Sequence, residues 1–562
     1  MGRAAIFIAA MAALVLLGLG ADSSRAAAGR ATDDGLLLYG GPIYTGVAGA
    51  PKAEAVLTRH GRIIFVGSLA EATKKAGPAR RIDLKGAAAF PGFVDAHAHM
   101  TGIGMRELTL NLEGTASVED LVARVKAYAA AHPGKGPIIG RGWIETHWPE
   151  KRFPTRADLD RAVGDRPVVL RRSDGHALVA NSAALALSGV SKDTKDPEGG
   201  RILRRADGEP DGMLVDNAQG LVSAGMPAAD TAMTREALVR AGKLYASRGW
   251  TGLDNMSVAG GDLTVLQGLA AEGALPIRVD NFMDPASSDE VLKRGPYADP
   301  TGRVRVRGIK LYADGSLGSR GAALLAPYAD APETSGLLVM QPEAMRPYMV
   351  RALAVGAQVA THAIGDRGNR LTLDSYEAVF SGNPAMGRAA RWRIEHAQIL
   401  APQDLPRFAK MGVIASMQPS HAIGDLYFAP ARLGEARLKE GYAWRDLLDS
   451  GAIICAGTDA PVEKGDPLIE FYAAVSRHSL DGFAGADWHL EEVVTRFEAL
   501  RMLTWAPAYA VFRERELGTL EVGKYADISV FSVDLMTAPV AKIPTAHAVL
   551  TVVEGRVVYE AH

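Results

Sequence analysis

Short apolar runs separated by glycine and proline occupy both ends of the chain. These runs cover residues 36–39, 55–58, 62–66, 527–531 and 548–559. Apolar runs of this length between turn residues predict β-strands. Each group alone would leave strand edges exposed, and pairing the two groups would remove those edges. We therefore predict that residues 33–88 and 516–562 form one small composite β domain of the sandwich type.

Between these ends, over residues 89–515, apolar strand-like runs alternate with helical stretches. The clearest strand candidates are residues 167–170, 309–312, 358–362, 393–396 and 452–456. Alternating strands and helices predict an α/β protein with a parallel sheet. Several of these runs end in chemically reactive side chains, which favours a TIM-like (β/α)8 barrel with its site at the carboxyl ends of the strands.

The first 28 residues have a different pattern. Arg3 precedes an Ala/Leu-rich apolar run over residues 4–20, and the sequence Ala26-Ala27-Ala28 follows shortly after. A positive start, an apolar run and small residues are typical of a secretory signal peptide. We expect cleavage after Ala28 and export to the periplasm or the medium. An uncleaved anchor remains the alternative, although the run is short for a membrane-spanning helix.

Composition narrows the class of partner. The chain has 562 residues, is 48% hydrophobic and 22% charged, and carries a formal net charge of −2. These values predict a globular protein of more than one domain and argue against a nucleic-acid or anionic-membrane partner. A small-molecule substrate fits better, and self-association into a homo-oligomer stays open. Cys455 is the only cysteine, so no disulfide can form within the chain.

Two histidines end the apolar run of residues 90–99, at His97 and His99. In an extended strand, residues two apart point to the same face, so both imidazoles can reach one ion. Neutral imidazole is a common zinc ligand. This spacing predicts a metal site at the end of a buried strand.

Other reactive residues follow later strand candidates. They are Lys310, His362, His396 and Asp459. Their spacing suits successive barrel units, which average about 30 residues each. The interval from His99 to Lys310 is 211 residues, too long for three ordinary units. We therefore expect an insertion after the first strand, over about residues 111–230.

The chain resembles the amidohydrolase superfamily, and most of all amidohydrolase family 3, which includes N-substituted formamide deformylases. The matching stretches are residues 91–99, 310–320, 361–366, 393–398, 417–421, 457–462 and 518–527. The resemblance implies two divalent ions, taken as zinc, held by residues on strands one, four, five, six and eight. The implied ligands are His97, His99, Lys310, His362, His396 and Asp459. Lys310 would bridge both ions as a carbamate formed with CO₂.

The resemblance also implies a reaction. A metal-activated hydroxide would attack a small, non-peptide acyl amide and release a carboxylate and an amine. Asp459 would serve as metal ligand and as general base. Hydrolysis of an ester, lactone or carbamate is the alternative on the same site. A metal-dependent isomerase and a binding protein that keeps the fold are further alternatives.

Five residues are expected to contact substrate. They are Trp143, His176, Asp314, Arg320 and His421, and Ser316 lies on the same glycine-rich loop as two of them. Arg320 could hold a substrate carboxylate or could instead pair with an internal acid. Asp366 and Glu395 are expected to orient neighbouring histidines.

Overall fold

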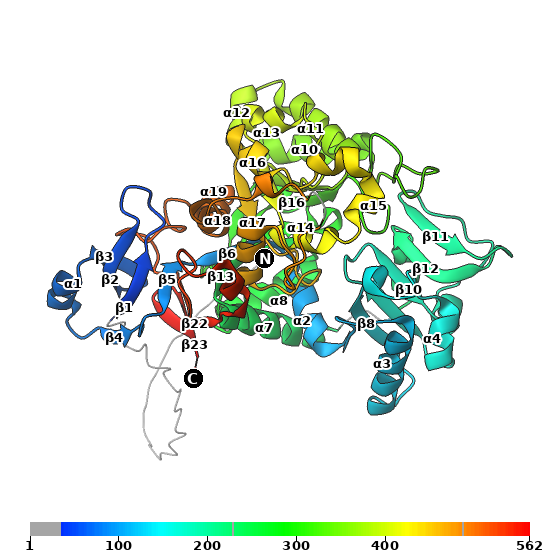
Figure 1. The fold of residues 1–562 in the computed structure, drawn as a ribbon, viewed down its shortest axis with the longest axis horizontal. Coiled ribbons are helices and arrows are strands. Elements are labelled where there is room, and N and C mark those ends of the chain that lie inside the picture. The colour runs from blue at the N-terminus through cyan, green and yellow to red at the C-terminus, as the bar shows by residue number, and fades with distance from the viewer. Residues whose placement is uncertain (1–34, 227–229, 486–487, 562) are drawn as a thin grey trace, which may run out of the picture. The chain divides into compact units, whose positions relative to one another are not determined.

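Eight parallel strands form a nearly closed barrel in the computed structural model, which describes residues 35–226, 230–485 and 488–561 (Figure 1). In barrel order they are β6 (Phe93–Ala98), β13 (Trp250–Val258), β14 (Arg278–Met283), β16 (Val304–Tyr312), β17 (Gln358–Ala363), β18 (Arg393–His396), β19 (Ile414–Met417) and β20 (Ile454–Ala456). A parallel bridge between Ala98 and Ala460 links the first strand to the segment after the eighth. The predicted TIM-like barrel is confirmed.

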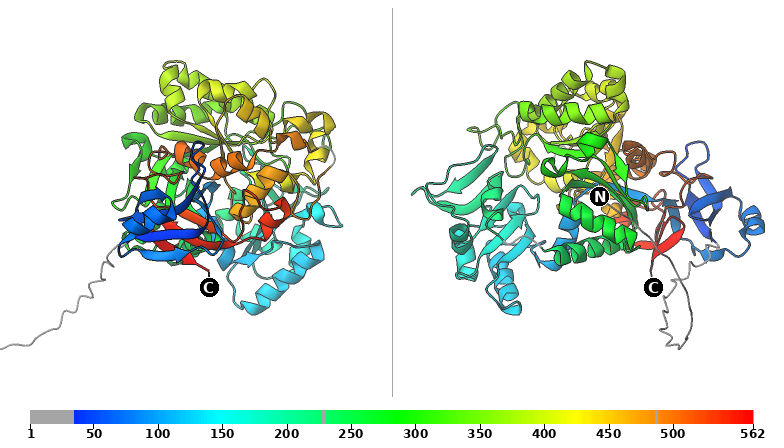
Figure 2. Two further views of the ribbon diagram at one scale, coloured as in Figure 1. Left: turned by 60° about the vertical axis from the view of Figure 1, so that its left-hand side comes forward. Right: turned by 180° about the vertical axis from the view of Figure 1, so that it is seen from behind.

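Helices connect the barrel strands and cover the outside of the barrel (Figures 1 and 2). They include α2 (Met100–Leu108), α7 (Thr231–Arg248), α8 (Gly260–Ala271), α10 (Pro342–Val355), α11 (Asp366–Phe380), α13 (Leu405–Met411), α14 (Pro419–Asp425), α16 (Trp444–Asp449), α17 (Pro467–Ser476), α18 (Arg496–Leu503) and α19 (Trp505–Ala510). Local sequence sets their ends. Helix α10 begins at Pro342, whose missing N–H is not needed there, and ends at Gly356 with a φ of 70°.

Strands from both ends of the chain join in one eight-stranded sheet (Figure 2). Its members are β1 (Leu36–Tyr44), β2 (Lys52–Arg59), β3 (Arg62–Gly67), β4 (Arg80–Asp83), β5 (Ala88–Pro91), β21 (Ile528–Phe531), β22 (Ala548–Val553) and β23 (Arg556–Glu560). Antiparallel pairing of β5 with β21 joins the two ends. The helix α1 (Leu69–Ala76) packs its buried Ala72 and Ala76 beside β2.

A second sheet fills the long interval between β6 and β13. Its strands, in spatial order, are β11 (Gly200–Arg204), β12 (Pro210–Asp216), β10 (Ala177–Ala180), β9 (Val168–Arg172), β8 (Ile138–Trp143) and β7 (Leu110–Asn111). Helices α3 (Val118–Ala131), α4 (Arg156–Ala162), α5 (Ser182–Leu187) and α6 (Gln219–Ser223) accompany it. The run at residues 167–170 is a strand, but it belongs to this inserted sheet and not to the barrel. It pairs with β8 and β10, whose apolar residues share its core.

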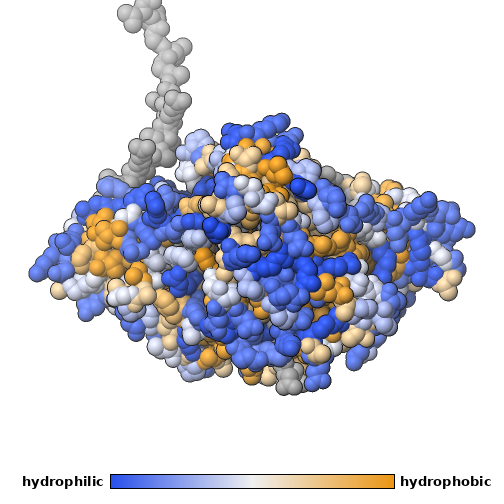
Figure 3. Space-filling model, turned by 90° about the horizontal axis from the view of Figure 1, so that it is seen from above, coloured by the Kyte–Doolittle hydropathy of each residue, from blue (hydrophilic) through white to orange (hydrophobic). Residues whose placement is uncertain are grey.

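The predicted signal segment and its cleavage site lie outside the described residues. Within residues 35–226, 230–485 and 488–561, no helix combines the length and apolar character needed to cross a bilayer. On the face drawn in Figure 3, hydrophobic side chains lie in several separate groups among a mostly hydrophilic surface, as is ordinary for a folded protein.

Candidate metal centre

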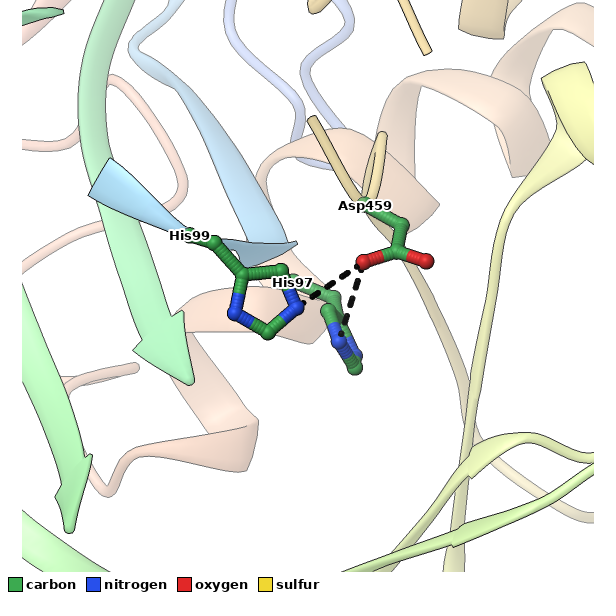
Figure 4. A group of neighbouring side chains, drawn as sticks. All are labelled: His97, His99 and Asp459. Carbon is green, nitrogen blue, oxygen red and sulfur yellow. Dashed lines mark ion pairs between the residues drawn. The ribbon is translucent and has the colours of Figure 1, made fainter. Parts of the chain in front are cut away.

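His97, His99 and Asp459 converge at the carboxyl end of the barrel (Figure 4). Asp459 Oδ1 lies 3.1 Å from His99 Nε2 and 3.5 Å from His97 Nε2. The two histidines come from the end of β6, and Asp459 follows β20. The predicted first and eighth strands therefore deliver their side chains to one point.

Hydrogen bonds to Nδ1 turn three imidazoles toward the centre. His97 Nδ1 donates to Glu395 Oε2 at 2.6 Å, and His99 Nδ1 donates to the Met256 carbonyl at 3.0 Å. His396 Nδ1 donates to Gln418 Oε1 at 2.7 Å. With the proton on Nδ1, each neutral ring presents a lone pair on Nε2.

This donor set fits a divalent cation. The Nε2 lone pairs of His97 and His99 face a carboxylate oxygen of Asp459, which is also an acceptor. Acceptors that converge in a buried site need a cation between them. His396, His421 and Asp459 form a second such group, with all their ligand atoms within 4.8 Å of one another.

The backbone around the centre is tied together by Asp95. Its carboxylate accepts hydrogen bonds from the Thr458 N–H at 2.8 Å, the Thr458 hydroxyl at 2.6 Å and the Tyr245 hydroxyl at 2.9 Å. These bonds join the first and eighth strands. Asp459, the next residue, has a φ of 54°, and His396 has a φ of 74°. Such left-handed backbone costs energy in a non-glycine residue and is typical of functional sites.

Lys310 lies at the base of the centre on β16. Its side chain is 1% exposed, and Nζ is 3.3 Å from His97 Nε2. No carboxylate among the described residues forms an ion pair with it. Burial lowers the pKa of Lys310 to about 8. The pKa of His97 falls to about 4 because of burial first and the Lys310 charge second.

A buried ion network supports Glu395, the partner of His97. Arg393 Nε donates to Glu395 Oε1 at 2.7 Å, and Arg393 Nη1 donates to Asp254 Oδ2 at 2.5 Å. All three side chains are fully buried. Burial alone would raise the pKa of Glu395, but the Arg393 charge, the His97 hydrogen bond and the nearby Lys310 together outweigh it and hold that pKa well below its usual range. Glu395 therefore stays ionised and fixes the His97 tautomer.

His362 is close to the centre but is turned away from it. Its ring centroid lies 4.5 Å from that of His396. Its Nε2, however, lies 3.4 Å from the Gly315 carbonyl and 3.5 Å from Asp314 Oδ1. His362 belongs to neither ligand group found among the described residues.

Two of the five predicted substrate contacts reach the centre. His421 lies on α14, with Nε2 3.8 Å from Asp459 Oδ2, and this buried nitrogen has no hydrogen-bond partner within the described ranges. The His176 ring lies 5.0 Å from that of His362, tilted by 44°, and its Nδ1 donates to Asp216 Oδ1 at 2.6 Å. His421 lines the carboxylate cavity described below, and His176 lines both cavities.

The structure does not bring the other three predicted contacts to the cavities described below. Trp143 is fully buried in the core of the inserted sheet and donates from Nε1 to the Leu170 carbonyl. Asp314 accepts from the backbone N–H groups of residues 323, 364 and 365. Arg320 pairs with Asp330 at 2.9 Å, which is the internal-acid alternative.

The two residues expected to orient histidines differ in outcome. Glu395 holds His97, as described above. Asp366 accepts instead from the Leu325 and Arg367 N–H groups and contacts no histidine in the hydrogen bonds of the described residues.

Two cavities meet at the centre, and Asp174, His176, His362, His396, Asp459 and Val462 line both. The carboxylate cavity, of about 460 Å³, is lined by acidic side chains that include Asp425, Glu463 and Asp481, together with apolar ones such as Phe428. The arginine cavity, of about 410 Å³, is lined by Arg141, Arg171 and Lys310. Both are large enough for a small organic ligand.

Sequence reasoning missed several supporting residues. Gln418 stands in the motif of residues 417–421, directly after the seventh strand, but the motif alone does not indicate its contact with His396. Asp95, Arg393 and Asp216 act through other side chains that are distant in sequence. One signal in the sequence could have pointed to Arg393. Glu395 stands two residues later on an apolar strand candidate, and a buried acid needs a nearby cation.

A barrel with convergent histidines and a carboxylate at its carboxyl end defines a metal-binding hydrolase class. Residues 80–559 match the sequence profile of the Amidohydrolase family, and the chain belongs to that family. The Bacillus subtilis (strain 168) protein YtcJ is 34% identical over 533 residues, covering 93% of this chain and 99% of YtcJ.

Two further comparisons agree with this family assignment. An N-substituted formamide deformylase of Arthrobacter pascens is 28% identical over 524 residues, covering 90% of this chain and 95% of the deformylase. The crystal structure of an uncharacterized metal-dependent hydrolase from Pyrococcus horikoshii OT3 superposes with a TM-score of 0.73. It is 29% identical and covers 90% of this chain and 99% of its own.

Proposed function

We propose that this protein is an exported, zinc-dependent amidohydrolase that cleaves the carbon–nitrogen bond of a small, non-peptide acyl amide. Two zinc ions would be held in the centre, bridged by a carboxylated Lys310. The observation that carries the proposal is the convergence of imidazole lone pairs and the Asp459 carboxylate on one point between two cavities. The Arthrobacter relative, whose name describes deformylation of N-substituted formamides, supports a C–N bond as the target.

The metal would be held by His97, His99, His396 and Asp459, with Lys310 below them. When bound, such ions lower the pKa of water and polarise a carbonyl oxygen. His362 would join the set after a rotation of its side chain, because its ring already lies edge to face against His396.

Asp459 is placed to move protons. One carboxylate oxygen faces His97 and His99, while the other lies 3.8 Å from His421 Nε2 and lines both cavities. Asp459 Oδ2 would accept a proton from the attacking water and return it to the departing amine nitrogen. His176 and His421 would orient the substrate carbonyl by donating from their ring nitrogens, since both lie along the cavity walls.

The surroundings of Lys310 support its carboxylation. A buried lysine without a carboxylate partner is costly as an ammonium ion. Reaction of its amine with CO₂ would replace that cation with a carbamate whose two oxygens suit two metal ions. Lys310 lies 3.3 Å from a histidine nitrogen of the centre, so the carbamate would form where the ions are needed.

The test combines metal analysis with an Asp459→Asn variant. Asn keeps the shape of the side chain and one ligand oxygen but cannot act as a base, so kcat on an amide is expected to fall by about 10²- to 10⁴-fold. Asp466→Asn is the matched control, because Asp466 caps α17 outside both cavities and Asn caps helices equally well.

Three results would contradict the proposal. Near-normal kcat in Asp459→Asn would remove Asp459 as the base. Full amide turnover by chelator-treated protein would show that the reaction does not need a metal. Hydrolysis of esters, lactones or carbamates with no turnover of any amide would move the function to the alternative substrate class.

A further inference from the structure

Two arginines stand side by side in the wall of the arginine cavity. Arg141 on β8 and Arg171 on β9 are register partners in the parallel strand pair of the inserted sheet. Their neighbours Gly140 and Leu170 belong to the opposite face of that sheet, where Leu170 packs in the apolar core. Alternation along the strands therefore turns both guanidinium groups away from the core and toward the same cavity.

Neither arginine is neutralised by an acid. Arg141 donates from Nη2 to the Ser173 carbonyl at 3.0 Å, and its buried Nε has no hydrogen-bond partner within the described residues. The Arg171 side chain makes no hydrogen bond or ion pair with the described part of the chain. The carboxylates that line this cavity are engaged elsewhere: Asp174 pairs with Arg172, and Asp216 pairs with His176.

Three other buried arginines of this chain are paired with acids. Arg172, the next residue, is held by Glu145 at 2.9 Å and by Asp174 at 2.5 Å. Arg278 pairs with Asp527 at 2.7 Å, and Arg393 pairs with Glu395 at 2.7 Å. Two adjacent like charges repel each other, and an unpaired polar group in a cavity wall is unfavourable. Arg141 is half-buried and Arg171 is exposed, both line the same cavity, and a ligand that supplies negative charge would relieve the repulsion between them.

The two cavities also differ in charge. The carboxylate cavity is lined by acidic side chains such as Asp425 and Glu463 together with the cationic Arg172 and Lys464, and Arg172 is already paired with acids. The arginine cavity contains the two arginines without an acid partner and reaches His99 and Asp459 of the centre. The two unpaired arginines therefore favour an anionic group of a substrate on the side of the arginine cavity.

We propose that Arg141 and Arg171 form a subsite for an anionic group of the substrate, a carboxylate or a phosphate, while the scissile amide lies at the metal centre. Guanidinium groups bind such oxyanions through paired N–H donors, which adds orientation to affinity. This inference rests on the proposed amidohydrolase function and names its substrate class: acyl amides that carry an acidic group.

The kinetic test compares matched substrates. N-acetylglycine and N-acetylglycinamide place a carboxylate or a neutral amide on the amine side. N-benzylsuccinamic acid and N-benzylsuccinamide place a carboxylate or a neutral amide on the acyl side. N-acetylaminomethylphosphonate carries a phosphonate in place of the carboxylate. The proteins are the wild type, Arg141→Gln, Arg171→Gln and the control Arg201→Gln, which changes an arginine of the same sheet outside both cavities.

For the best acidic substrate, kcat/KM is expected to fall by about 10- to 100-fold in Arg171→Gln and in Arg141→Gln, chiefly through KM. The neutral partner and the control variant should change by less than about twofold. Preference for the carboxylate or the phosphonate arm identifies the natural group. Equal losses on acidic and neutral substrates, or no loss on either, would overturn the subsite.

A binding measurement separates this inference from the proposed function. Calorimetric titration of the purified protein with succinate, and separately with inorganic phosphate, should show about 10-fold weaker binding of at least one anion in Arg171→Gln than in Arg201→Gln. If no amide is hydrolysed but this difference is present, the proposed reaction fails and the anion subsite stands. Equal binding of both anions by both variants overturns the subsite whatever the enzyme hydrolyses. Because the Arg171 side chain makes no polar contact with the described residues, its replacement is expected to leave the circular dichroism spectrum unchanged.

Discussion

Replacing Gln418 with Met tests whether the orientation of His396 controls metal binding. The side-chain amide oxygen of Gln418, Oε1, accepts a hydrogen bond from His396 Nδ1 at 2.7 Å. Gln418 is 1% exposed and His396 is 4% exposed. Met has a similar length but offers no comparable acceptor. The variant therefore leaves a buried N–H without a partner and frees the ring to change tautomer.

The expected loss can be worked out from these contacts. A buried donor without a partner costs about 1–3 kcal/mol. Loss of a hydrogen-bond partner behind a metal-binding histidine typically weakens metal affinity by about 10- to 100-fold. That range corresponds to about 1.4–2.8 kcal/mol, which agrees with the unpaired N–H. We expect zinc affinity to fall by that amount.

The assay is competition for zinc against a chromogenic chelator, with guanidinium unfolding of metal-free protein as a check on stability. Gln358→Met is the matched control. Gln358 is fully buried and donates to the Arg391 and Ala510 carbonyls at the opposite end of the barrel strands. The Gln358→Met variant should lose stability but keep its zinc affinity. Zinc affinity within twofold of the wild type in Gln418→Met would refute the role given to His396.

Three further predictions concern the bridging lysine, the buried network and the N-terminus. Lys310→Ala should lower the zinc content of purified protein below two ions per chain by elemental analysis, and an unchanged content would remove the bridging role. Arg393→Met should lower the free energy of unfolding by about 3–5 kcal/mol, because it leaves Glu395 and Asp254 as buried carboxylates without their cation. The exposed pair of Arg235 with Glu272 is its control, and Arg235→Met should cost less than about 1 kcal/mol. Mass spectrometry of protein from the exporting host should show a mature chain that begins at Gly29, and an intact N-terminus would favour an uncleaved anchor.

The order of the barrel strands was predictable from the sequence because the reactive residues follow apolar runs. Lys310, His362 and His396 lie on β16, β17 and β18, the fourth, fifth and sixth strands. A parallel barrel places the carboxyl ends of its strands at one rim, so spacing along the chain translates directly into proximity.

The insertion was much harder to predict than the barrel. Its length was evident from the interval before Lys310, but its strands read like barrel strands, as the run at 167–170 shows. Arg141 and Arg171 meet only because β8 and β9 pair in one register. A one-residue shift would turn one of them into the core, and sequence periodicity does not define register between strands.

Individual side-chain roles were also difficult to predict. Trp143, Asp314 and Arg320 stand near motifs of the site, yet each is engaged by the fold itself. Gln418 and Asp95 support the site through hydrogen bonds to partners on other strands. Such pairings depend on three-dimensional position, and the partners are far apart in the sequence. Residue spacing along one chain therefore does not predict them.

The most direct test of the central claim is a zinc titration of metal-free protein with amide turnover as the readout. The account predicts no turnover without metal, a rise on addition of zinc, and a plateau at two ions per chain. Full turnover by the metal-free protein, or a plateau that is independent of zinc, would contradict it.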